Sequence, residues 1–241
     1  QPPPALFPYP YPRWAQRWPV AVLRGILYYL LVWPATMLLA YPRIRGREHL
    51  RGVRGPVLVV ANHVTAKDDV GFVLAALPAR LRHRLAVAMI GERLRDLRRP
   101  PRELGLLRRA VDPIGYLLVA AVFNVFSMPK QSGVRASFQY AGESVDRGFS
   151  ILVFPEGELT RDGRVGAFRS GIGALAKKLN VPVVPIKIEG LFELRQARKH
   201  FAWPGTVRVV IGPPARFGPE TEPEEVAKQL QQIVADLAAE Q

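Results

Sequence analysis

The sequence reads Pro56-Val57-Leu58-Val59-Val60 and then Ala-Asn-His-Val-Thr-Ala-Lys-Asp over residues 61–68. An apolar run of this length, bounded by Gly55 and a polar turn, predicts a buried strand. His63 then lies in the loop that leaves the strand, and Asp68 lies near the start of the next helix. If the loop folds back, the Asp68 carboxylate accepts a hydrogen bond from one imidazole nitrogen. The other nitrogen is then free to take a proton from a substrate hydroxyl.

A histidine and an aspartate five positions apart also arise by chance, so two other interpretations compete with this one. In the first, Asp68 or Asp69 begins a helix and His63 simply fills a loop. In the second, His63, Asp68 and Asp69 bind a metal ion. No second histidine lies nearby in the sequence, and we therefore predict no metal site.

Apolar runs and amphipathic segments alternate from about residue 42 to the end of the chain. We predict strands at 57–61, 84–90, 150–154, 182–188 and 206–211. We predict helices at 69–77, 112–126, 134–147, 169–179 and 222–239. Such alternation predicts an α/β fold with a mixed, largely parallel sheet flanked by helices.

The first 41 residues differ in composition from the domain predicted at 42–241. Residues 1–19 are rich in proline and aromatic residues, which predicts an extended linker. Residues 20–41 are mostly apolar and long enough to span a bilayer as a helix. Because Pro34 favours a kink or two short helices, we expect a membrane-embedded or monotopic hairpin rather than a single span. A buried packing helix is the alternative.

The charge of the chain points to anionic partners. Its formal net charge is +14, from 34 lysines and arginines against 20 acidic residues. Nucleic acid, an anionic membrane and a polyanionic substrate all fit such an excess. The arginines at 80–109 are interleaved with leucines and form no recognisable nucleic-acid motif, so we predict a membrane surface and no nucleic-acid partner. The chain has no cysteine, which excludes a thiol nucleophile and a thiolate metal site.

Two further blocks follow the first one along the chain. Phe154, Pro155, Glu156 and Gly157 end the strand predicted at 150–154, and Val-Pro-Val-Val-Pro occupies 181–185. In this order and spacing the blocks resemble the glycerolipid acyltransferase family, the superfamily of lysophosphatidic acid and glycerol-3-phosphate acyltransferases. The resemblance covers roughly residues 20–215.

The family's first motif, N-H-x4-D, matches Asn62, His63 and Asp68, and its second motif aligns with 126–130. The third block of the family, F-P-E-G-T-R, matches 154–157, and the fourth, V-P-V-x-P, matches 181–185. The pieces Pro-Arg-Trp at 12–14 and Arg-Trp-Pro at 17–19 are also similar to acyltransferase domains fused to acyl-activating enzymes.

This resemblance implies an enzyme that moves a fatty acyl group from acyl-CoA or acyl carrier protein to the hydroxyl of a lysophospholipid-type acceptor. It implies no cofactor beyond the acyl donor. Because the absence of cysteine fits the cytosol, we expect the protein on the cytoplasmic face of a membrane. The resemblance also implies His63 as the general base and Asp68 as the residue that orients it. The residues for which we predict substrate contacts are Asn62, Lys130, Phe154, Pro155, Glu156, Gly157, Arg161 and Arg169.

The chain departs from the family pattern at positions associated with the phosphate of the acceptor. Glu158 and Leu159 stand where the family usually has threonine and arginine, and Lys130 alone keeps a charge in the second motif. Lysine binds a phosphate as a point charge, whereas arginine forms two parallel hydrogen bonds with it. Either Arg161 or Arg169 replaces the missing arginine, or both are ordinary surface residues. A catalytically silent membrane- or carrier-binding module is therefore the alternative function.

Overall fold

The computed structural model describes residues 9–65, 68–101, 103–129, 133–197, 203, 206–218 and 220–237. Its centre is a seven-stranded sheet of order β1-β7-β6-β2-β5-β3-β4, in which all neighbours are parallel except β6 and β7. The strands are β1 (Arg43–Arg45), β2 (Leu58–Ala61), β3 (Leu85–Ile90), β4 (Val125–Met128), β5 (Ser150–Val153), β6 (Val183–Glu189) and β7 (Arg208–Ile211). The predicted α/β class, the largely parallel sheet and all five predicted strands are confirmed.

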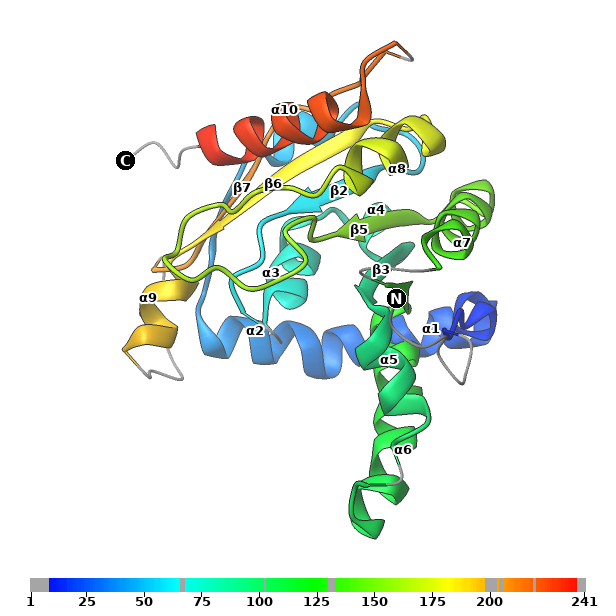
Figure 1. Cartoon of the computed structure of the whole chain (residues 1–241). Helices are drawn as coiled ribbons and strands as arrows, with labels where there is room; N and C mark the ends of the chain where they lie inside the picture. Colours follow the sequence, from blue (N-terminus) through cyan, green and yellow to red (C-terminus); the bar gives the residue numbers. More distant parts are fainter. Residues whose placement is uncertain are drawn as a thin grey trace.

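Helices cover both faces of this sheet (Figure 1). The α-helices are α1 (Trp18–Leu27), α2 (Trp33–Leu39), α3 (Asp69–Ala76), α4 (Ala79–Arg82), α5 (Gly91–Arg98), α6 (Leu106–Phe123), α7 (Val134–Asp146), α8 (Gly171–Leu179), α9 (Leu191–Gln196) and α10 (Pro223–Asp236). The 3₁₀-helices are η1 (Arg13–Gln16) and η3 (Arg47–Leu50), and η2 (Tyr28–Val32) is a π-helix.

Alternation along β2 builds two cores, one on each face of the sheet. Leu58 and Val60 pack in the core covered by α7, α8 and α10. Val59 and Ala61 pack in the other core, with side chains of η2, α3 and α6. Because every residue of β2 is buried, the strand reads as a continuous apolar run in the sequence, as expected for a central parallel strand.

The sequence prediction missed β1 and β4 among the strands. The sequence predicts a helix over 112–126, whereas α6 ends at Phe123 and β4 begins at Val125. Asn124 makes this boundary, because it adopts the left-handed conformation (φ 51°) that commonly ends a helix. Its Nδ2 donates a 3.0 Å hydrogen bond to the carbonyl of Leu85 and so fixes the start of β4 beside β3.

Residues 9–16 differ from the predicted extended linker, since they pack on β4 and α7. The carbonyl oxygen of Pro10 accepts a 2.9 Å hydrogen bond from Oγ of Ser127. Arg13 and Glu143 form an ion pair at 2.7 Å. This part of the predicted linker therefore belongs to the domain, and residues 1–8 lie outside the described residues.

The apolar segment forms one helical run, α1-η2-α2, and the expected hairpin is wrong. Proline inside a helix lacks an N–H, and its ring clashes with the carbonyl one turn earlier. The wider π turn of η2, in which the Trp33 N–H donates to the carbonyl of Tyr28, directly precedes Pro34 and accommodates it. The run Trp18–Leu39 is long and apolar enough to cross a membrane, because an 18-residue window within it has a mean hydropathy of 1.6. Of that window, 17% is buried.

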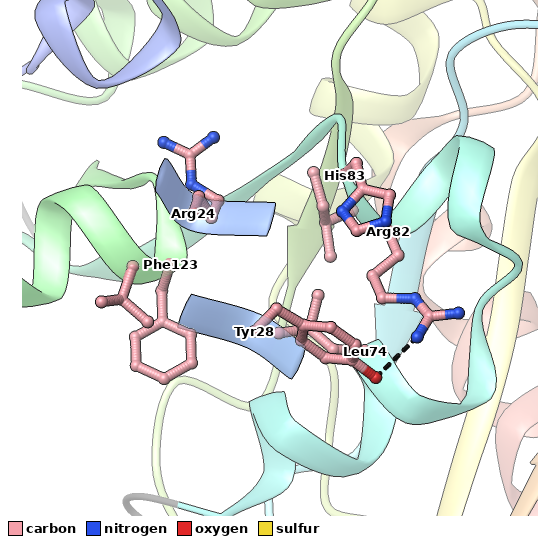
Figure 2. Close-up of a pocket in the computed structure, with 8 residues that line it drawn as sticks. Arg24, Tyr28, Leu74, Arg82, His83 and Phe123 are labelled. Atoms are coloured by element: carbon pink, nitrogen blue, oxygen red, sulfur yellow. Dashed lines mark hydrogen bonds between the residues drawn. The ribbon is translucent and has the colours of Figure 1, made fainter. Parts of the chain in front are cut away.

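Contacts with the body hold this helical run in place from its inner side. Tyr28 accepts a 2.7 Å hydrogen bond from Nη1 of Arg82, whose guanidinium carbon lies 4.7 Å from the tyrosine ring centroid (Figure 2). Both residues line a small pocket together with Arg24 and His83. Arg24 is buried, and its Nε donates a 2.9 Å hydrogen bond to the carbonyl of Ala121 in α6. The inner side of the run is thus part of the packed domain.

Close packing of α8 against the start of α10 depends on Gly173. A Cβ atom at Gly173 would lie 1.9 Å from the carbonyl oxygen of Pro223, whereas one at Gly171 would meet nothing within 4 Å. We expect Gly173→Ala to lower the free energy of unfolding by about 3 kcal/mol, because the two helices must move apart. Gly171→Ala is the control and is expected to be neutral or slightly stabilising. Denaturant unfolding measures both, and equal stabilities of the two variants would contradict the close contact.

Candidate active site

Two of the sequence blocks meet at the carboxyl edge of the sheet. β2 and β5 are parallel neighbours, with Val60 in register with Val153. The loop after β2 carries His63, and the loop after β5 carries Phe154 to Gly157. Ligands of open α/β sheets commonly bind at this edge. The topology thus brings together the residues predicted from separate parts of the sequence.

The carboxylate that orients His63 in the structure is that of Asp69, the first residue of α3. Its Oδ2 lies 2.8 Å from Nδ1 of His63. The same carboxylate accepts hydrogen bonds from the backbone N–H groups of Val64 (2.7 Å) and Thr65 (3.0 Å) and from the Thr65 hydroxyl (2.8 Å). Asp69 is 1% exposed, so these donors replace its hydration.

This geometry corrects the prediction that Asp68 orients the histidine. Asp68 is the exposed residue that precedes α3, and its backbone N–H donates a 3.1 Å hydrogen bond to Oγ1 of Thr65. The loop turns so that the backbone N–H groups of Val64 and Thr65 point at the Asp69 carboxylate. Asp69 is one position later than the aspartate that the motif spacing indicates. The competing interpretation is correct about the helix, because α3 begins at Asp69, but it is wrong about His63, which contacts the Asp69 carboxylate.

The imidazole of His63 is held in one orientation from two directions. The Asp69 carboxylate accepts the proton of Nδ1–H, so the neutral ring presents the lone pair of Nε2. The ring of Phe154 stacks on the imidazole, with centroids 4.7 Å apart and planes inclined by 26°. The His63 side chain is 20% exposed, so it is accessible to a substrate at the edge of the sheet. This arrangement suits a general base.

Asn62 has a structural role in the fold, whereas the sequence predicts it as a substrate contact. Its Nδ2 donates a 2.9 Å hydrogen bond to the carbonyl of Ile188, and its Oδ1 accepts a 2.7 Å hydrogen bond from the Ile188 N–H. The residue is 3% exposed. Asn62 therefore ties the end of β2 to β6 and positions the loop that carries His63.

Glu156 braces the site from the neighbouring loop. Its Oε1 accepts a 3.0 Å hydrogen bond from the backbone N–H of His63, and its Oε2 accepts a 3.2 Å hydrogen bond from the N–H of Gly166. Burial raises the pKa of the Glu156 carboxyl, and the two backbone hydrogen bonds partly offset that effect. Although the sequence predicts Glu156 as a substrate contact, its described contacts favour a role in bracing the loop.

We expect Glu156→Gln to lower both stability and turnover. One of the two backbone N–H groups would face the amide NH₂ and lose its acceptor, which costs about 1–3 kcal/mol. The loop of His63 would then be less well held. Glu158→Gln is the matched control, because the Glu158 side chain is 61% exposed. Thermal unfolding and turnover measure both effects, and a Glu156→Gln variant as stable and active as Glu158→Gln would contradict this role.

The remaining predicted contacts divide into near and distant ones. Pro155 is buried, and its carbonyl accepts a 3.1 Å hydrogen bond from the N–H of Arg169. Gly157 has φ 70°, and its N–H donates within the turn to the carbonyl of Phe154 at 3.2 Å. A Cβ at Gly157 would lie 2.8 Å from Nε of Arg169, so this guanidinium lies directly against the Gly157 loop. Lys130 lies outside the described residues.

Arg161 and Arg169 therefore differ in their relation to the site. The Arg161 side chain is 89% exposed and lies 3.7 Å from the carboxylate of Glu158. Nε of Arg169 is 3.4 Å from the carbonyl oxygen of Glu156, inside the third block. The geometry thus separates two residues that the sequence left as equal candidates.

Three positioning contacts escaped the sequence prediction. The N–H of Thr160 donates a 2.9 Å hydrogen bond to the carbonyl of His63. Nη1 of Arg195, in α9, donates a 3.1 Å hydrogen bond to the carbonyl of Val64. The third contact is the Thr65 hydroxyl on Asp69. Thr65 lies inside the first block and Asp69 directly follows it, whereas no sequence signal connects Arg195 with that block. Within the described part of the chain, no three histidine, aspartate or glutamate side chains gather as a metal site requires.

Comparisons with known proteins identify the family of this chain. The family model described as Acyltransferase matches residues 42–189. The chain is 40% identical over 73 residues to the chloroplastic 1-acyl-sn-glycerol-3-phosphate acyltransferase BAT2 of Brassica napus. The aligned segment covers 30% of this chain and 21% of that protein. It is 24% identical over 169 residues to the human 1-acyl-sn-glycerol-3-phosphate acyltransferase beta, covering 70% and 53%. The matches thus span about half or less of these relatives' lengths.

A solved structure is similar to this fold. The crystal structure of the 1-acyl-sn-glycerophosphate (LPA) acyltransferase PlsC from Thermotoga maritima aligns with a TM-score of 0.56 at 24% identity. The alignment covers 92% of this chain and 80% of that one, which supports the fold. The family model covers well over half of the sequence and includes both loops of the site. The chain belongs to the Acyltransferase family.

Proposed function

We propose that this protein transfers a fatty acyl group from acyl-CoA or acyl carrier protein to the hydroxyl of a lysophospholipid acceptor of the 1-acylglycerol-3-phosphate type. The observation that carries the proposal is the pair of His63 and Asp69, 2.8 Å apart, at the edge of the sheet where the third block also lies. The names of the similar proteins support the acceptor class.

His63 would act as the general base, oriented by Asp69. Nε2 takes the proton of the acceptor hydroxyl while the oxygen attacks the thioester carbonyl. Asp69 stabilises the imidazolium that forms. When the tetrahedral intermediate collapses, the carbon–sulfur bond breaks and the thiolate takes the proton from Nε2. The products are an ester and a free thiol, and no acyl-enzyme is required because the thioester is already activated.

Arg169 is our candidate for the acceptor's phosphate, in place of the arginine that the third block lacks. Its position against Gly157 and the Glu156 carbonyl supports this choice. We expect Arg169→Ala to raise the KM for 1-acylglycerol-3-phosphate by about tenfold, the loss of one charge-assisted contact. The KM for a monoacylglycerol without phosphate should change little. Arg161→Ala is the matched control, and an equal rise in KM for that variant would contradict the assignment.

Membrane association belongs to this proposal, with the apolar run Trp18–Leu39 as the attachment and the cytoplasmic face as its location. The outer side of the run carries large apolar residues, including Trp18, Leu30 and Leu38 at 78%, 66% and 71% exposure. A lipid acceptor with one acyl chain resides in the bilayer, so an enzyme held at its surface meets the acceptor where it is concentrated.

The direct test offers the purified protein labelled long-chain acyl-CoA or acyl carrier protein as donor. The acceptors are 1-acylglycerol-3-phosphate, lysophosphatidylcholine and monoacylglycerol, and products are identified by mass spectrometry. Transfer to the phosphate-bearing acceptor, absent with His63→Ala, is the expected result. No transfer with any donor and acceptor would overturn the proposal in favour of a catalytically silent membrane- or carrier-binding module on the same fold.

A further inference from the structure

Helix α6 carries an apolar stripe that no described part of the protein covers. Its large apolar side chains recur at the spacing of one helix face, from Leu107 through Val111 and Ile114 to Leu118. Their exposed fractions are 79%, 52%, 57% and 59%. Such a contiguous row is unusual on a soluble surface and marks an interaction site.

The opposite face of α6 is the one that joins it to the domain. Tyr116 and Ala120 are buried in the core that also holds residues of η2 and α3. The carbonyl of Ala121 accepts the hydrogen bond from Arg24 of α1. Because these contacts fix the rotation of the helix about its axis, the exposed stripe cannot turn inward without breaking them.

The surroundings of the stripe are strongly basic. Residues 93–109 contain seven arginines and two acidic residues. Arg108 and Arg109 are exposed beside Leu106 and Leu107 at the amino-terminal end of α6. An apolar stripe flanked by arginines matches a bilayer with anionic headgroups, because the leucines enter the acyl region while the guanidinium groups reach the phosphates.

The placement of α6 also suits a membrane surface. Figure 1 shows α6 projecting from the body, in a direction different from that of the α1-η2-α2 run. β3 and β4 are parallel neighbours, so the connection between them, α5 and then α6, must lead from the carboxyl edge of the sheet back to its amino edge. Of the two ends of α6, the amino-terminal one is therefore nearer along the chain to the carboxyl edge of the sheet, the edge at which His63 lies.

We propose that α6 is a second membrane-inserting element, which lies in the interface of an anionic bilayer and, with the run Trp18–Leu39, sets the orientation of the domain. Two helices of different direction define a plane, whereas one helix leaves rotation about its own axis free. The carboxyl edge of the sheet is thereby held close to the lipid surface. This inference goes beyond the proposed transferase activity and does not depend on it.

The experiment reads insertion directly at α6 and uses the absence of native cysteine in the full chain. Ile114→Cys is labelled with an environment-sensitive fluorophore and mixed with vesicles of phosphatidylglycerol and phosphatidylcholine. Lys228→Cys, on the exposed side of α10 across the sheet, is the matched control. We expect a blue shift and protection from aqueous quenchers at position 114 and neither at position 228. Vesicle-bound protein without a shift at position 114 would overturn the proposal.

Sedimentation with the same vesicles measures how much α6 contributes. The triple variant Leu107→Gln, Ile114→Gln and Leu118→Gln is expected to partition about tenfold or more weakly than the wild type. Trp203→Gln removes a large apolar side chain that is 83% exposed outside these helices and should partition as the wild type does. Equal partitioning of the triple variant and the wild type would overturn the proposal. A blue shift at position 114 in the absence of lipid, together with self-association of the protein, would also overturn the proposal. A second copy of the chain would then cover the stripe.

Discussion

His63→Ala is expected to reduce acyl transfer by about 10³-fold with little change in stability. The variant removes the group that accepts the hydroxyl proton, so attack on the thioester would require an alkoxide formed without help. The Asp69 carboxylate keeps its three hydrogen bonds to Val64 and Thr65, and the loop is therefore expected to retain its fold. Single-turnover transfer and thermal unfolding measure the two quantities separately.

The matched control for this variant is His49→Ala. His49 is exposed and lies 2.9 Å from the carbonyl of Ile211, away from the loops of the site. Its removal should leave transfer near the wild-type level. If His63→Ala were folded and turned over as fast as His49→Ala, His63 would not be the base, and the proposed mechanism would be wrong.

The fold was largely predictable because its central strands are buried on both faces. The runs at 57–61 and 150–154 are apolar at nearly every position, and only a covered parallel strand requires that. β1 and β4 escaped prediction for different reasons. β1 has three residues, two of them exposed arginines, and β4 follows α6 with Asn124 as the only boundary signal.

The N-terminal segment shows a limit of reading composition. Prolines and aromatic residues predicted a linker, yet Tyr11 and Ser137 share a 3.0 Å hydrogen bond and the Pro10 carbonyl binds Ser127. Such partners lie more than a hundred positions away in the sequence, where no local pattern points to them. Pro34 likewise indicated a break, but a π turn absorbs it within one helical run.

In the site, residue types were predictable and their partners were not. The first and third blocks were identified in sequence, and the sheet brings them together as expected. Asn62 and Glu156 nevertheless bind backbone, because buried polar side chains must satisfy their hydrogen bonds with whatever donors the fold places beside them. Arg195 reaches the His63 loop from α9, and only the folded chain makes that contact visible.

Asp69→Asn is expected to lower turnover by about 10²- to 10³-fold, and Asp68→Asn is expected to change it less than about twofold. An asparagine at position 69 whose NH₂ takes the place of Oδ2 would lose the acceptor of the Val64 N–H, because Oδ2 binds both that group and Nδ1 of His63, and would keep Oδ1 for the N–H and hydroxyl of Thr65. Its NH₂ would then face Nδ1 of His63 and donate to it. The neutral imidazole would carry its proton on Nε2, the atom that must accept the proton of the acceptor hydroxyl.

Because asparagine begins helices as well as aspartate does, Asp68→Asn preserves the start of α3 and isolates the choice between neighbouring carboxylates. Steady-state kinetics distinguish a change in the tautomer of His63 from partial unfolding of the variant. Loss of the correct tautomer lowers kcat and leaves the KM of both substrates nearly unchanged. A variant that is partly unfolded instead loses activity in proportion to its folded fraction, which thermal unfolding measures. If Asp68→Asn were the inactive variant and Asp69→Asn the active one, the histidine would pair with Asp68 during catalysis, and the loop would have to rearrange when substrate binds.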